Sequence, residues 1–101
     1  MRLFKIEKSS NSTKKYMVYE IYDGSRSRII HFGAAGYEDF TIHKDLKRKG
    51  NYIARHTAAE DWSRSGLLTP GFWSRWLLWN ETTITKSAED IARRFNIRII
   101  L

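Results

Sequence analysis

The sequence predicts an α+β domain in which a small antiparallel sheet is covered by about three helices. Two β-prone runs meet at Asp23-Gly24, and the stretch from Ile84 to Phe95 repeats apolar residues at helical spacing. An Asp-Gly pair between such runs is a strong hairpin signal, which places a hairpin at about residues 15–32. A chain of 101 residues can bury one modest core, so we expect a single domain over residues 1–101.

A glycine pair closes the predicted hairpin. Gly33 and Gly36 bracket two alanines directly after the second strand. Such a loop can cradle phosphate through its backbone amides, and glycine is also needed wherever a tight turn requires a positive φ. A plain exit turn is the favoured interpretation, because the phosphate loop of KH modules joins two helices and this one follows a strand.

The first predicted helix runs from Asp45 to about Glu60. Asp45 suits its N-terminus, where a carboxylate interacts favourably with the helix dipole. We expect Leu46, Tyr52 and Ile53 to face the core. This orientation leaves a run of three cations on the solvent side: Lys47, Arg48 and Lys49.

Two later helices have clear signals. Thr69 and Pro70 supply an N-cap and a proline at the first helical position, and an apolar face follows, made of Phe72, Trp73, Trp76 and Leu77. The last helix repeats apolar residues at Ile84, Ala88, Ile91, Ala92 and Phe95, and its polar residues are expected in solvent, namely Glu89, Asp90, Arg93 and Arg94. Asn96 can end this helix. Residues 97–101 are β-prone and predict a final strand, or a tail that docks on the sheet.

Composition narrows the class of partner. The formal charge of +7 arises from 18 basic and 11 acidic residues, and such a field attracts polyanions, of which nucleic acid is the commonest in a cell. The absence of cysteine excludes disulfides and thiolate metal sites. No apolar run is long enough to span a bilayer, and the apolar run near Met1 is too short for a signal peptide. We therefore expect an intracellular protein without a membrane partner.

The candidate binding residues concentrate between Tyr37 and His56. The basic ridge, as we name it, comprises Lys44, Lys47, Arg48, Lys49 and Arg55. Several cations on one solvated face are what phosphate binding requires. His43 and His56 are expected to orient or donate to phosphates, and aromatic neighbours can pack on sugars or stack on unpaired bases: Tyr37, Phe40 and Tyr52. The same surface could be extended by Arg75, Arg93 and Arg94.

Two alternative functions remain, one that draws on residues of the same region and one that draws on the tryptophans. His43 with Asp45, and Arg55 with His56, could form a general base and a phosphate clamp for a metal-dependent nuclease, but no motif dedicates carboxylates to a metal ion, so we expect no cofactor and no catalytic site. The four tryptophans, Trp62, Trp73, Trp76 and Trp79, are favoured as core residues, with a protein interface as the alternative. Trp79 lies near a helix end and is the expected exposed member.

The strings that carry these residues resemble the pattern of a family of small basic proteins encoded by nucleocytoplasmic large DNA viruses. They are HFGAAGYEDFTIHKD, RKGNYIARH and GFWSRWLLWN, and a helix of the SAEDIARRF kind closes the pattern. The resemblance implies an origin and a kind of protein rather than a reaction. It is consistent with binding of DNA, favoured over RNA, with little sequence specificity. The alternative is a structural virion protein, so we expect the protein in the infected cell or in the virion.

Overall fold

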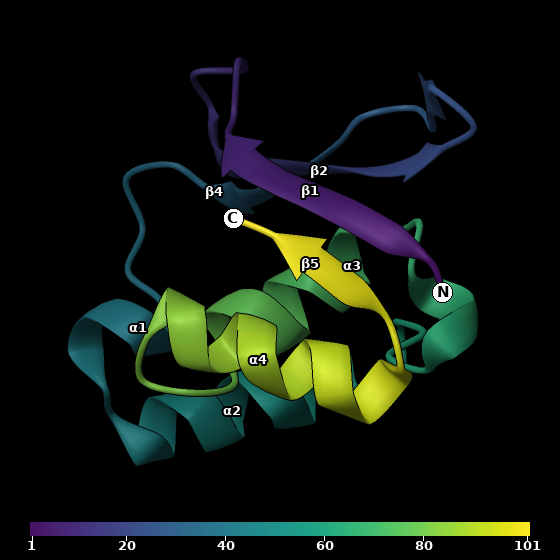
Figure 1. Ribbon diagram of the computed structural model, residues 1–101. Helices are drawn as coiled ribbons and strands as arrows, with labels where there is room; N and C mark the ends of the chain where they lie inside the picture. Colours follow the sequence, from purple (N-terminus) through teal and green to yellow (C-terminus); the bar gives the residue numbers. More distant parts are fainter.

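The computed structural model describes residues 1–101 as two layers, a sheet lying over a group of helices (Figure 1). The strands are β1 (Leu3–Lys8), β2 (Lys14–Tyr22), β3 (Ser25–Arg26), β4 (Ile30–Ala34) and β5 (Arg98–Ile100). The helical segments are α1 (Phe40–His43), α2 (Leu46–His56), the 3-10 turn η1 (Arg64–Gly66), α3 (Pro70–Trp73), the π-helical turn η2 (Ser74–Leu78) and α4 (Ile84–Phe95). The predicted α+β class is confirmed.

The hairpin is confirmed, and its turn explains why Asp-Gly stands there. Asp23 and Gly24 both have positive φ, 48° and 73°, as a two-residue turn that matches strand twist requires. β3 continues directly from the turn, and β4 pairs with β2 further along. The register changes by one residue between them, because Ile21 faces Arg26 whereas Val18 faces Ile30. A bulge therefore separates β3 from β4 on the same edge of β2.

The sheet is mixed rather than wholly antiparallel. β1 pairs antiparallel with β2, but β5 lies parallel beside β1, with Phe4 facing Ile99. The backbone N–H of Arg98 donates to the carbonyl of Arg2 at 2.8 Å, just before this pairing begins. The predicted final strand is thus confirmed. Its direction could not be predicted, because it depends on where α4 delivers the chain.

α4 has the predicted bounds. The Thr83 hydroxyl accepts a hydrogen bond from the amide of Lys86, and Asn96 ends the helix in the left-handed conformation, with φ 53°. Ile91 is fully buried. The expectation that Asp90 lies in solvent is wrong, because its carboxylate is buried and accepts from Asn80 Nδ2 at 2.8 Å.

The core lies between the sheet and the α3–η2 segment. Thr69 caps α3 as predicted, accepting from the amide of Phe72, and Trp73 is completely buried. The Trp73 ring lies 5.5 Å from that of Phe4 on β1 and 6.4 Å from that of Phe32 on β4, measured between ring centroids. Its indole N–H donates to a backbone carbonyl. Trp73 therefore joins both layers.

Gly33 is required by packing. Its φ is 78°, and a Cβ added there would come within 2.8 Å of a side-chain methyl of Leu78. Gly36, with φ 85°, lies in open space at the following turn. These observations favour the plain exit turn, since both glycines are explained by conformation and close approach alone.

α2 stands apart from this core. The main hydrophobic cluster draws on the strands, α3, η2 and α4, and includes no residue of α2. α2 is instead attached through its own side chains to the end of η2, as the next section describes. No helix of this structure has the length and apolar character that crossing a membrane would require.

Candidate nucleic-acid interface

The outer face of α2 carries most of the basic ridge. Asp45 caps the helix, its carboxylate accepting from the amides of Lys47 at 2.9 Å and Arg48 at 3.2 Å. With the helix start set there, Lys47, Arg48 and Arg55 are exposed to solvent. Lys44, in the left-handed conformation just before the cap, is exposed as well. Four of the five predicted cations are therefore exposed to solvent on α2 or directly before it.

Lys49 is the exception, and the expectation that it points outward is wrong. Its ammonium donates to the carbonyl of Asn80 at 2.7 Å and lies 4.9 Å from the ring centre of Phe40. Burial, together with the nearby Arg75, lowers the pKa of Lys49. Leu46, expected in the core, is exposed instead. Along α2 the inward face is thus rotated from the predicted one and includes a cation.

Both histidines of the region are engaged in local structure. His43 Nδ1 accepts a hydrogen bond from the amide of Asp45 at 2.9 Å. His56 Nδ1 lies 3.3 Å from a carboxylate oxygen of Glu60, and its ring stacks on Tyr52. The Asp45 carboxylate caps α2, so its hydrogen bond to His43 is made by its backbone amide and not by its side chain. No group of three or more His, Cys, Asp or Glu side chains is placed to hold a metal ion.

An aromatic column fastens α2 to the end of η2. Tyr52 stacks on Trp79 with ring centroids 4.4 Å apart and planes 3° from parallel, and on His56 at the same distance. His43 lies against Trp79 at 5.3 Å. Tyr52 is confirmed as buried, and burial, aided by the charge of Glu60, raises its pKa well above the ordinary value. Trp79 is half-buried rather than exposed, and both faces of Tyr52 are covered.

Arg75 is partly buried in this region and packs against tryptophan rings. Its guanidinium lies 4.3 Å from the ring centre of Trp76 and 5.5 Å from that of Trp62, and it donates to the carbonyl of Trp79. Burial, and then the charge of Arg94, lowers its pKa. The guanidinium serves to pack the tryptophans.

Arg93 and Arg94 both form ion pairs with the carboxylate of Asp90. Arg93 Nη2 lies 2.9 Å and Arg94 Nε 3.2 Å from the oxygens of Asp90. Arg94 also covers Trp76, at 4.5 Å from its ring centre. The two arginines therefore stabilise the buried Asp90 carboxylate, although 78% of the Arg93 side chain and 49% of the Arg94 side chain remain exposed to solvent.

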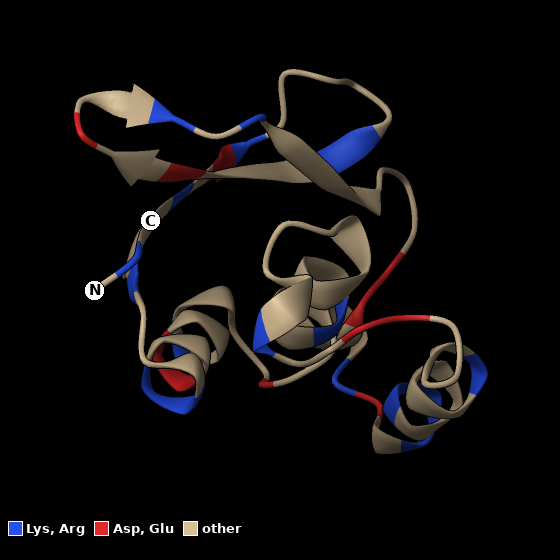
Figure 2. Ribbon diagram, turned by 90° about the vertical axis from the view of Figure 1, so that its right-hand side faces the viewer, with Lys and Arg blue, Asp and Glu red and all other residues tan.

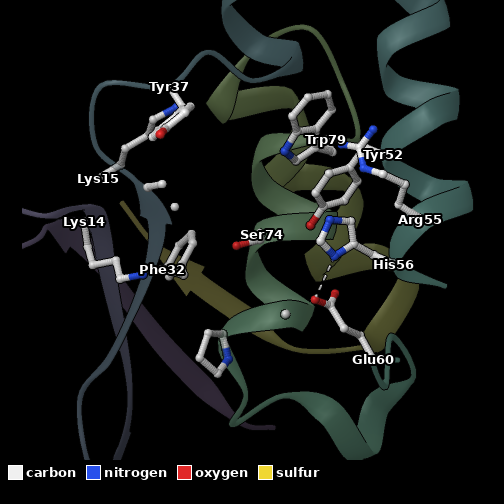
Figure 3. A pocket seen from close by; sticks show the side chains of 14 residues that line it. Lys14, Lys15, Phe32, Tyr37, Tyr52, Arg55, His56, Glu60, Ser74 and Trp79 are labelled. Carbon is white, nitrogen blue, oxygen red and sulfur yellow. Dashed lines mark hydrogen bonds and ion pairs between the residues drawn. The ribbon is translucent and has the colours of Figure 1, made fainter. Parts of the chain in front are cut away.

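A cleft of about 370 Å³ separates the sheet from α2. Figure 3 shows Lys14, Lys15 and Tyr37 on one wall and Arg55, His56 and Trp79 on the other. The remaining lining residues are Phe32, Gly33, Ala34, Tyr52, Glu60, Pro70, Gly71 and Ser74. Of the aromatic side chains predicted to contact nucleic acid, Tyr37 is strongly exposed at this cleft, whereas Phe40 and Tyr52 are buried.

Sequence reasoning did not include Lys14 and Lys15 among the binding residues. They begin β2, where β4 runs beside them and Lys14 pairs with Ala34. Their position opposite Arg55 depends on how α2 docks, which no local pattern reports. The sequence feature that could have indicated them is the pair of adjacent lysines at the start of the strand.

Fold and cleft together define a small basic α+β domain with a cation-bearing cleft between sheet and helix. The chain belongs to a family of unknown function (DUF5754), whose model matches residues 4–56. This span runs from β1 to the end of α2, so it contains the strand residues and the α2 residues of the cleft, but not Trp79. No curated protein and no solved structure matches the chain.

Proposed function

We propose that this protein binds nucleic acid, with DNA expected in preference to RNA, through phosphate contacts that carry little sequence specificity. The observation that supports the proposal is the solvated group of cations on and beside α2: Lys44, Lys47, Arg48 and Arg55. Cations on one exposed face can each meet a phosphate and release its condensed counterions, which supplies much of the affinity.

Few carboxylates compete for these cations. Asp45 directs its carboxylate at backbone amides of α2. Glu38 pairs with Arg48 at 3.2 Å, but about half of each side chain remains exposed. An exposed pair of this kind contributes little and exchanges readily for a phosphate. The region therefore keeps a positive excess.

The protein-interface alternative has weaker support at the tryptophans. Trp73 is completely buried, and none of the other three is among the large exposed apolar side chains. A virion contact would more naturally use the exposed apolar residues around α1 and the start of α2, namely Tyr37, Ile42 and Leu46. Such a contact would persist in high salt, whereas phosphate binding weakens steeply.

Fluorescence anisotropy of a labelled DNA duplex at several salt concentrations tests the proposal. Four phosphate contacts give a slope of log K against log salt of about −3 to −4. Lys47→Ala combined with Arg48→Ala is expected to flatten the slope by up to about two units. A labelled RNA duplex of the same sequence tests the preference for DNA.

A control must distinguish the effect of removing cations from α2 from the effect of lowering the net charge of the protein. Lys and Arg residues occur on strands as well as helices (Figure 2), so removing any two lowers the net charge equally. Lys86→Ala combined with Arg98→Ala is the matched control, because both side chains are exposed and neither lies on α2. Equal flattening by the control pair, or no flattening by the α2 pair, would remove this helix as the binding surface.

A further inference from the structure

The cleft beside α2 shares two of its lining residues, Lys14 and Lys15, with a second hollow. This neighbouring hollow, of about 680 Å³, is bordered by both lysines and by Lys8 and Ser12 of the β1–β2 segment. Both hollows are therefore lined by the start of β2. We call the two hollows together the groove; its lining includes the β1–β2 loop, the start of β2 and Arg55 of α2.

The carboxylates of this groove already have partners. Asp39 accepts from the Lys15 ammonium at 2.6 Å and from the amide of Thr41. Glu60 accepts from the indole N–H of Trp62 at 2.9 Å and lies beside His56. Three cations of the groove have no carboxylate within ion-pairing distance: Lys8, Lys14 and Arg55. An anionic ligand would complete their charge balance.

Tyr37 supplies a free aromatic face at this groove. Its side chain is 74% exposed, and it takes part in none of the aromatic pairs that cover Tyr52 and Trp79. In Figure 3 Tyr37, from the loop after β4, lies beside the end of the Lys15 side chain, across the cleft from Trp79. An exposed aromatic ring between cations is the arrangement on which proteins stack unpaired bases.

We infer that this groove receives a single nucleic-acid strand, whose phosphates lie between Lys14 and Arg55 and one of whose bases stacks on Tyr37. The inference rests on the proposed function and names its ligand more narrowly. A cleft of 370 Å³ is at the small end of ligand pockets and suits one nucleotide unit. A duplex keeps its bases paired and stacked inside, so it can reach the outer cations of α2 but has no free base for Tyr37.

The inference is tested by anisotropy with a labelled deoxythymidine oligonucleotide and a mixed-sequence duplex of equal length. The wild type is expected to bind the single strand more tightly than the duplex. Tyr37→Ala is expected to weaken single-strand binding at least about fivefold, in line with the loss of one stacked base, while duplex binding changes less than about twofold. Lys14→Ala should reduce the salt slope on the single strand by about 0.7.

Matched variants control for exposure and for ring chemistry. Tyr37→Phe keeps the stacking face and should retain single-strand affinity, and Tyr22→Ala removes another exposed tyrosine, at the far end of β2, without effect. If Tyr37→Ala weakens binding of both ligands equally, or of neither, the single-strand site is overturned. In that case, duplex binding with the predicted salt slope still supports the proposed function. Absence of salt-dependent binding to either ligand overturns both.

Discussion

Trp79→Ala tests how α2 is held on the domain. Trp79 stacks on Tyr52 at 4.4 Å and contacts His43 at 5.3 Å, while α2 contributes nothing to the main hydrophobic cluster. A half-buried tryptophan removes on the order of 150 Å² from solvent, worth roughly 3 to 4 kcal/mol at about 25 cal/mol per Å². Each aromatic contact adds about 0.5 to 1.5 kcal/mol. Because alanine keeps part of the buried area and the site can partly collapse, we expect the net loss to fall below the sum of these contributions, at about 3 to 4 kcal/mol.

Urea denaturation followed by circular dichroism measures this loss, and hydrogen exchange locates it. Without the Tyr52–Trp79 stack, α2 keeps the hydrogen bond from Lys49 to Asn80 and the more distant contact of Tyr52 with Trp62. The amides of α2 should therefore lose protection before those of β1 and β2. Trp79→Phe keeps a ring on Tyr52 and should cost clearly less, and Tyr37→Ala should change stability by no more than about 0.5 kcal/mol. A cost below about 1 kcal/mol for Trp79→Ala, with α2 as protected as in the wild type, would refute this account of docking.

Further predictions concern single positions. Gly33→Ala should cost at least about 1 to 3 kcal/mol in urea denaturation, because φ is positive and a methyl group would meet a neighbouring side chain, whereas Gly50→Ala, in open space within α2, should gain about 0.5 to 1 kcal/mol. Burial raises the pKa of Tyr52, so its contribution to stability is full below about pH 10 and declines as pH rises further; Tyr52→Phe should remove that alkaline decline in pH-dependent unfolding. For Asp90, burial raises the pKa, but hydrogen bonds from Asn80 and Arg94 outweigh it and the net pKa is lowered. Its contribution is therefore present above about pH 4 and lost as pH falls through the depressed value, and Asp90→Asn should flatten the acid limb of the same measurement.

The local elements followed from short-range rules. Asp23-Gly24 predicted the hairpin because both turn residues need positive φ, and Thr69-Pro70 predicted the start of α3 because capping and a fixed φ act within one turn. The apolar repeat from Ile84 and the left-handed end at Asn96 set the bounds of α4 in the same way. Each of these signals depends only on neighbouring residues.

The candidate site depended on long-range packing. A helical pattern places Lys49 among cations, but the carbonyl of Asn80, 31 residues later, draws it inward. The position of Trp79 near a helix end predicts an exposed side chain, but Tyr52 of α2 stacks on its ring. These outcomes could not be predicted because they depend on the rotation of α2 against a segment that is distant in the sequence.

By itself, the sequence determined the class of the domain, its hairpin, its three main helical segments, its final strand and its strong positive charge. Only the tertiary structure decided which cations remain in solvent, that β5 runs parallel to β1, and that Lys14 stands opposite Arg55 across a cleft. The physical reason is the separation in sequence between the residues that interact. Turn conformation, capping and helical periodicity are set within a few residues, whereas burial of a charge and the walls of a cleft are set by which distant surfaces pack together.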